Sequence, residues 1–175
     1  EKIFSREELS EMLKSKNKDG NFFNDIVFDC KNLENFKILC LKIKTFLPEI
    51  TNLKEFLLIK YKSQENMNVL QISIVLGKEK IFLYLFENIY CKIFELKEFI
   101  YEVDDNDENF YHKLAQHGSL SMLELVTARL ITQLTREEFV DFVKVRRFDG
   151  ATIMIAAKNN KEAVKTFIYD LVESV

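Results

Sequence analysis

The feature that most constrains this sequence is an internal repeat. Residues 5–20 align without a gap on residues 135–150, where six of the sixteen positions are identical and six more keep their chemical type. The offset of 130 residues corresponds to about three periods of 43. Periods in this range are typical of chains built from similar units that pack side by side. We therefore expect about four copies of one structural unit.

Two weaker copies lie between these ends. They are found when each copy is defined by a turn residue and by a second residue, eleven positions later, that breaks the apolar run. The windows run from Asp19 to Cys30, Asn66 to Gly77, Asp107 to Gly118 and Asp149 to Asn160. The fourth position after the turn is always apolar (Phe23, Leu70, Tyr111, Ile153), and the eighth is always small or aliphatic (Val27, Ile74, Ala115, Ala157). Such positions are expected where neighbouring helices approach closely.

The last copy resembles an ankyrin repeat. Residues 149–160 contain a turn, a short apolar run with the pair Ala156-Ala157 and a polar break, and a second apolar helix follows. This order is similar to the ankyrin pattern of a turn followed by Thr-Pro-Leu-His-x-Ala-Ala-x-x-Gly, with Met154 at the His position and Asn160 at the final Gly. The resemblance implies a protein–protein interaction module without catalytic activity.

The position of the ankyrin His is occupied by Asn24, Gln71, His112 and Met154 in the four copies. In the family this side chain bonds the backbone of a neighbouring turn, so the resemblance implies a structural role here. A catalytic role for His112 is the alternative, and it has less support. The second histidine, His117, lies at a break and is expected to face solvent.

The steps from turn to turn are 47, 41 and 42 residues, which is longer than the 33 residues of an ankyrin repeat. Capping boxes at Ser5/Glu8, Asn52/Glu55 and Thr135/Glu138 indicate an extra short helix in each connection. The copy that starts at Glu95 lacks a capping Ser, Thr or Asn, and Pro48 is expected to end a helix near Leu47.

We therefore predict an all-α solenoid of about four ankyrin-like helical repeats with an extra capped helix per repeat. The four segments are residues 5–47, 52–91, 95–134 and 135–175, each with a capped helix, a turn, an inner helix and an outer helix. Apolar stripes at helical spacing mark the outer helices: Leu33, Phe36, Leu39 and Ile43; Ile81, Phe82 and Leu85; Met122, Leu123 and Val126; Val164, Phe167, Ile168 and Leu171. A different α-solenoid of paired or triple helices is the alternative.

Composition agrees with a helical globular chain and excludes several functions. Hydrophobic residues make up 47% and charged residues 30%, while four Gly and one Pro are too few for a loop-rich fold. The net charge of −3, with both signs interspersed, argues against nucleic-acid binding. No apolar run approaches the roughly 20 residues that span a bilayer, so membrane insertion is not expected.

Three cysteines, Cys30, Cys40 and Cys91, have no metal-site spacing and are expected to be reduced and buried. This favours a cytoplasmic location, or the host cytosol for part of a bacterial effector. The sequence begins with Glu1, so we expect a segment of a longer protein.

No motif for chemistry or for a cofactor stands out. The sequence has no Gly-rich phosphate loop, no Cys/His cluster and no nucleophile elbow. The acidic run 104–108 fails the EF-hand pattern in both possible registers, so no metal is expected. The paired carboxylates Glu7-Glu8 and Glu137-Glu138 are expected to stabilise helix starts rather than to catalyse acid/base chemistry.

Charged residues recur before the turns. Asp104 and Asp105 precede their turn by the same distance as Arg146 and Arg147 precede theirs, at an offset of 42 residues. Two hypotheses follow: an exposed ion-pair cluster between neighbouring repeats, or a charged rim for a partner.

The predicted function is binding of another protein through the concave face and the turn tips. The candidate positions, expected to be exposed, are Asn21, Asn68, Asp105, Asp107, Asn109, Arg147 and Asp149. One alternative is a structural scaffold that spaces domains or forms homo-oligomers. Another is the targeting domain of a larger multidomain effector or toxin.

Overall fold

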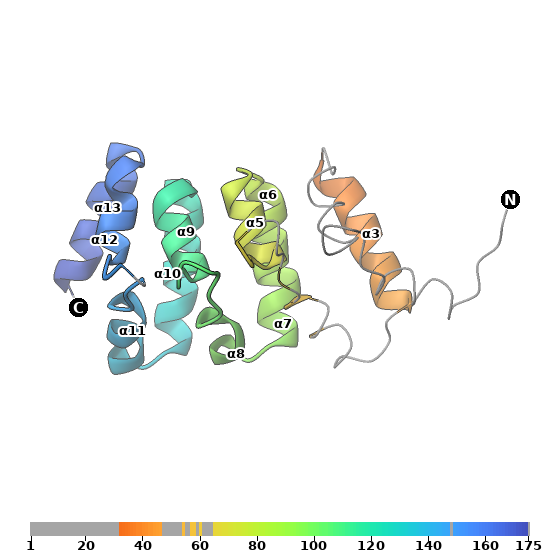
Figure 1. The fold of residues 1–175 in the computed structure, drawn as a ribbon. Coiled ribbons are helices and arrows are strands. Elements are labelled where there is room, and N and C mark those ends of the chain that lie inside the picture. The colour runs from red at the N-terminus through yellow and green to blue at the C-terminus, as the bar shows by residue number, and fades with distance from the viewer. Residues whose placement is uncertain are drawn as a thin grey trace, which may run out of the picture.

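The computed structural model describes residues 32–46, 54, 57, 58, 60, 65–147 and 149–174 (Figure 1). Within these ranges the secondary structure is helical, with one isolated antiparallel bridge between Val103 and Asn109 and no β-strand. The prediction of an all-α fold is therefore confirmed. The first capping boxes and the window from Asp19 to Cys30 lie outside the described residues.

The α-helices are α3 (Leu33–Phe46), α5 (Val69–Val75), α6 (Glu79–Leu85), α7 (Cys91–Ile93), α8 (Leu96–Ile100), α9 (Phe110–His117), α10 (Leu120–Gln133), α11 (Arg136–Val143), α12 (Ile153–Ala156) and α13 (Glu162–Ser174). A π-helical turn, η2 (Phe86–Tyr90), joins α6 to α7, and a 3-10 turn, η3 (Ala157–Asn159), extends α12.

Helix pairs lie side by side in a row along the chain (Figure 1). The third segment has a short helix, α8, followed by the inner helix α9 and the outer helix α10, and the fourth repeats this order with α11, α12 and α13. The second segment contributes the inner helix α5 and the outer helix formed by α6, η2 and α7. This is the order of helices that the sequence predicts for these segments.

Capping side chains fix the starts of the short helices. The Glu138 N–H donates to Thr135 Oγ1 at 3.2 Å, and the Thr135 N–H donates to Glu138 Oε2 at 2.9 Å, which confirms the predicted capping box. Glu95 is the N-cap of α8, and the Glu98 carboxylate accepts its N–H at 3.2 Å, which is the N3 half of a capping box. These bonds satisfy N–H groups that have no partner inside the helix.

An aromatic layer holds the segments together. The ring of Phe99 on α8 lies 6.0 Å from that of Phe110 on α9 and 6.1 Å from that of Phe86 in the preceding outer helix. In the next segment, Phe142 on α11 lies 6.2 Å from Phe110 and 5.5 Å from Tyr111. The short capped helices therefore cover the inner helices, and the aromatic rings form one continuous core.

The predicted apolar stripes form this core where their side chains are described. Phe36, Ile81, Phe82, Leu85, Met122, Leu123, Val126, Val164 and Ile168 are buried, and Leu33, Phe167 and Leu171 pack against them. The side chains of Leu39 and Ile43 lie outside the described set. Of the small positions between inner helices, Ala115 and Ala157 are completely buried.

Hydrogen bonds between segments reproduce the sequence period. Among the described residues, the side-chain bonds between different segments join positions separated by 37 to 45 residues, with Tyr90 to Leu57, 33 residues apart, as the exception. Asn160 is one example, since its amide donates to the carbonyls of Ala115 at 2.9 Å and Gly118 at 3.1 Å. Residues one period apart are therefore spatial neighbours.

We predict that Ala115→Leu destabilises the chain by about 1–3 kcal/mol, because added methylene groups have no space between inner helices. Ala128, also in a helix but exposed, provides the matched control Ala128→Leu, for which we expect a change within about 0.5 kcal/mol. Urea unfolding measures both values. Equal stability of the two variants would contradict close packing at Ala115.

Candidate functional site

The candidate site is the set of tip loops that precede the inner helices, residues 65–68, 101–109 and 144–152 without 148. Two predicted binding residues are the N-caps here. Asn68 Oδ1 accepts the N–H groups of Leu70 at 3.0 Å and Gln71 at 3.1 Å, and Asn109 Oδ1 accepts those of Tyr111 and His112, both at 3.0 Å.

The expectation that Asn68 and Asn109 are exposed is wrong, since both are buried. The inner helices begin inside the protein, where water cannot reach the first backbone N–H groups. A buried N–H without a partner is costly, so a side-chain oxygen has to supply the acceptor. The polar character of these asparagines therefore reflects capping.

Gln71 links the second segment to the third. Its Nε2 donates to the Glu108 carbonyl at 2.7 Å, and its Oε1 accepts the Asn68 N–H at 2.9 Å. The interpretation that this position bonds the backbone of a neighbouring turn is confirmed for Gln71.

His112 occupies the equivalent position in the third segment and is completely buried. Its Nδ1 lies 2.9 Å from Asn109 Oδ1, and because that oxygen can only accept, Nδ1 carries the proton. Burial lowers the pKa of His112, while the Glu108 carboxylate and the Val145 backbone oppose the shift without reversing it. The neutral imidazole is therefore favoured. His117 is exposed, as predicted.

A buried ion cluster lies behind the tip loop of the third segment. The Lys113 ammonium contacts Asp104 Oδ2 at 2.6 Å and the Glu108 carboxylate, and Glu65 of the preceding tip loop lies 3.9 Å away. Burial disfavours the charged ammonium, but the bonds to Asp104 and Glu108 outweigh it and raise the pKa of Lys113. The acidic run 104–108 therefore encloses a lysine from the protein itself.

Arg147 extends this cluster into the fourth segment. Its Nη1 lies 2.6 Å from Glu108 Oε1, and its Nη2 lies 3.4 Å from Asp149 Oδ2. The hypothesis of an exposed cluster between Asp104-Asp105 and Arg146-Arg147 is wrong in its partners. Arg146 donates to the Gly150 carbonyl at 3.0 Å.

Local bonds turn Asp104 inward. Its Oδ1 accepts the N–H groups of Asn106 at 2.9 Å and Glu108 at 3.0 Å. Asp104 is thus buried at the base of the loop. Asp104 is therefore not the partner of Arg147, and the Glu108 carboxylate forms that ion pair.

The outer part of the tip loops is exposed and ordered by bonds between neighbouring loops. The Asp105 N–H donates to the Glu65 carbonyl at 2.8 Å, and its carboxylate accepts a hydrogen bond from the Asn66 amide at 2.6 Å. Asp107 is exposed with a left-handed φ of 56°, and Asp149 is exposed and accepts the Ala151 N–H at 2.9 Å.

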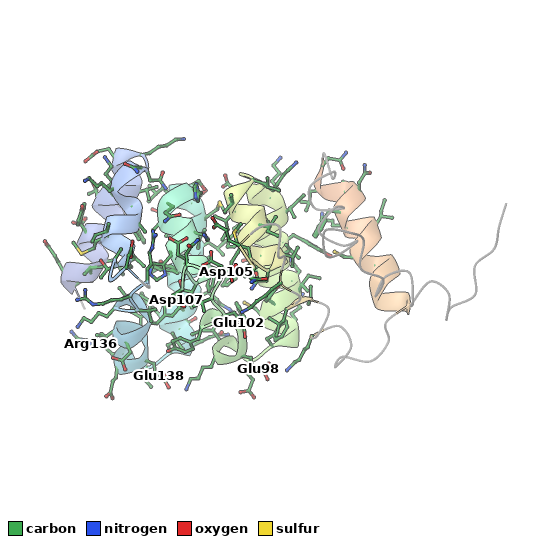
Figure 2. All side chains as sticks on the ribbon, viewed as in Figure 1. Glu98, Glu102, Asp105, Asp107, Arg136 and Glu138 are labelled. Atoms are coloured by element: carbon green, nitrogen blue, oxygen red, sulfur yellow. The ribbon has the colours of Figure 1, made fainter. Side chains whose placement is uncertain are left out.

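Figure 2 shows Asp105 and Asp107 near the middle of the view, whereas Glu98 on α8 and Arg136 and Glu138 on α11 lie lower. The structure thus places Asp105, Asp107, Arg147 and Asp149 on the tip loops. Asn21, the remaining predicted residue, lies outside the described residues.

Sequence reasoning missed Lys113, which joins the predicted tip residues electrostatically. A signal was present, because Lys113 occupies the position held by Ile72 and Ile155 in the neighbouring copies. A lysine at an apolar position requires buried carboxylates nearby, and the preceding acidic run could supply them.

A second set of ion pairs joins the short helices. Lys54 contacts Glu98 at 2.6 Å, and Lys97 contacts Glu138. The hydrogen bond from Lys54 lowers the pKa of Glu98, and the hydrogen bond from Lys97 lowers that of Glu138. Glu98 and Lys97 are exposed and Lys54 and Glu138 are half-buried, so water screens both pairs and they contribute little to stability.

Other chemistry has few candidates in the part of the chain that the structure describes. No group of three or more His, Cys, Asp or Glu side chains there is arranged to hold a metal ion. Cys40 is buried and Cys91 half-buried, and burial raises the pKa of the Cys91 thiol. Among the described helices, none has the length and apolar character needed to cross a membrane.

No protein-family model matches the sequence, and no curated protein matches it either.

We predict that Lys113→Met destabilises the chain by about 3–5 kcal/mol, because Asp104 and Glu108 would keep buried charge without their main partner. Lys80→Met, at an exposed position on α6, is the control and should change stability by less than about 0.5 kcal/mol. Urea unfolding at neutral pH measures both. Similar stability of Lys113→Met and the native chain would contradict a buried cluster.

We also predict a pH dependence from His112. Its pKa is lower in the folded chain than in the unfolded chain, so below pH of about 6.5 the unfolded chain binds more protons and stability falls. His112→Gln, which copies Gln71, should reduce this loss by up to about 1.4 kcal/mol per pH unit. Unfolding measured between neutral pH and pH of about 5 tests this.

His117→Gln is the matched control, because it removes the other histidine of the sequence from an exposed position. It should change the pH profile less than His112→Gln does. The opposite order would contradict the assignment to His112.

Proposed function

We propose that the chain is a divergent, ankyrin-like α-solenoid that binds another protein through its tip loops and has no catalytic activity. The sequence period, the row of helix pairs and the contacts between residues one period apart support the architecture. Backbone bonds that close the tip loops, from Asp104 N–H to Glu108 O and from Arg147 N–H to Ala151 O, agree with hairpin-like tips.

The single observation that carries the proposed function is that neighbouring tip loops are bonded to one another. Glu65 and Asn66 bond Asp105, and Arg147 meets Glu108 of the adjacent loop. A surface held in place before binding loses less conformational entropy when a partner arrives. These bonds therefore favour a recognition surface over a set of mobile connections.

The chemistry of this surface indicates the type of partner. Glu65, Asp105, Asp107 and Asp149 are exposed on the tips, as are Lys144 and Arg146 on the last tip loop, whereas Lys113 is buried behind the tips. Arg147 is partly buried and is paired with Glu108. A partner surface with Lys or Arg side chains would be electrostatically complementary to these carboxylates.

The test uses neutralising substitutions on the tips. Asp105→Asn together with Asp107→Asn should weaken partner binding roughly three- to tenfold, with the larger effect at low salt, because exposed charges are screened. The bait is the chain with a photo-crosslinking residue at position 106. The partner that this bait captures is then titrated against the native chain, this double variant and the control double variant described below.

The control is Glu124→Gln together with Asp170→Asn, two exposed carboxylates on the outer helices α10 and α13. It removes the same charge but should leave affinity unchanged. A partner whose affinity falls equally in both double variants, or in neither, would contradict binding at the tips.

A further inference from the structure

Tyr101 is a large aromatic side chain on the tip-loop surface. It is the C-cap of α8 and the first residue of the tip loop 101–109, and it is 45% exposed. Among the described residues, the other exposed large hydrophobic side chains lie on helices or at their ends, outside the tip loops. Tyrosine is one of the residues enriched at the energetic centres of protein interfaces, so the exposed ring of Tyr101 is a candidate contact for a partner.

The aromatic core holds the ring of Tyr101 in place. Its centre lies 5.8 Å from that of the Phe142 ring on α11, and the two rings are nearly perpendicular, at 81°. Phe142 is itself buried and packs against Phe110 and Tyr111. A side chain that is fixed before binding loses less conformational entropy when a partner arrives. The exposed part of Tyr101 is therefore preorganised for contact.

Two other aromatic rings of the chain carry a lysine over the ring. Lys37 Nζ lies 5.9 Å from the centre of the Tyr84 ring. Lys54 Nζ lies 5.3 Å from the centre of the Phe94 ring. At such distances the negative face of the ring attracts the cation. Tyr101 receives no such contact from a lysine or arginine among the described residues, although it is exposed.

Carboxylates lie around Tyr101. Glu98 precedes it by three residues, Glu102 follows it, and Asp105 and Asp107 belong to the same tip loop. Figure 2 shows Glu102 between Glu98 and Asp105 in the view. Glu98 and Glu102 are each paired with a lysine of the preceding segment, at 2.6 Å and 3.0 Å, whereas the two aspartates are exposed on the loop. The exposed ring is thus combined with negative charge, which favours a cationic group of the partner.

We propose that Tyr101 binds an arginine side chain of the partner, with the guanidinium stacked on the exposed ring and attracted by the carboxylates of the tip loop. This inference rests on the proposed function and deepens it, because it names the side chain that the tip loops recognise. Arginine is favoured over lysine, since its planar guanidinium stacks on aromatic rings and is more weakly hydrated than an ammonium group.

Two labelled peptides test the proposal by fluorescence anisotropy: one of alternating arginine and glycine, and one with lysine in place of each arginine. The native chain should bind the arginine peptide more tightly. Tyr101→Leu should weaken that binding about two- to fivefold and reduce the preference for arginine, because leucine has no π-system. Tyr101→Phe keeps the ring and should keep the preference. Circular dichroism checks that both variants are folded.

Tyr169→Leu is the matched control, because Tyr169 on α13 is 39% exposed and lies outside the tip loops. It should leave both affinities unchanged. An equal loss in Tyr169→Leu and Tyr101→Leu overturns the proposal. A native chain that binds neither peptide, or that binds both equally, overturns it as well.

The double variant Asp105→Asn with Asp107→Asn separates this inference from the proposed function. It should weaken both peptides alike, because it removes charge and leaves the ring in place. If this double variant weakens binding and Tyr101→Leu does not, the role of Tyr101 is overturned and binding at the tip loops stands.

The sequence has no tryptophan, so Tyr101→Trp introduces a single fluorescent reporter at the site. Titration with the arginine peptide should change its emission, and the change should saturate over the same concentrations as the anisotropy. Tyr169→Trp places the same reporter outside the tip loops, and its emission should stay constant. A response of equal size in the two variants overturns binding at Tyr101.

Discussion

Burial of the short inner helices is the constraint on which the rest of the structure depends. Helices as short as α5, α9 and α12 are unstable alone in water, so their stability has to come from packing. Phe99 and Phe142 on the short capped helices supply it from one side, and the outer helices supply it from the other. This accounts for the short capped helices α8 and α11, which carry these two rings.

Where the inner helices are buried, each of their polar groups needs a hydrogen-bond or ion-pair partner nearby. Asn68 and Asn109 cap the helix starts, Gln71 bonds the next tip loop, and Lys113 is enclosed by carboxylates. Each of these contacts uses atoms of a tip loop, so the loops become fixed as a consequence of helix burial. The same bonds that satisfy the core therefore order the surface that we propose binds a partner.

The sequence predicted the helical class, the apolar stripes and the Thr135 capping box, because these depend on local spacing. It did not predict how far Asn68, Asn109 and Arg147 are buried, because a periodic alignment identifies neighbouring residues without showing the direction of their side chains. Asp104 turns inward through bonds to its own loop, and no repeat offset encodes such a bond. The sequence has no capping Ser, Thr or Asn for α8, whereas in the structure Glu95 is the N-cap and the Glu98 carboxylate accepts its N–H.

One repeat position illustrates how the copies have become different. Ile72 packs against Met67, Lys113 lies in the ion cluster, and Ile155 is exposed on α12. A lysine at this position is stable only beside carboxylates, and the third segment itself supplies Asp104 and Glu108. The same repeat position therefore holds a paired charge in one copy and an apolar side chain in the two others that the structure describes.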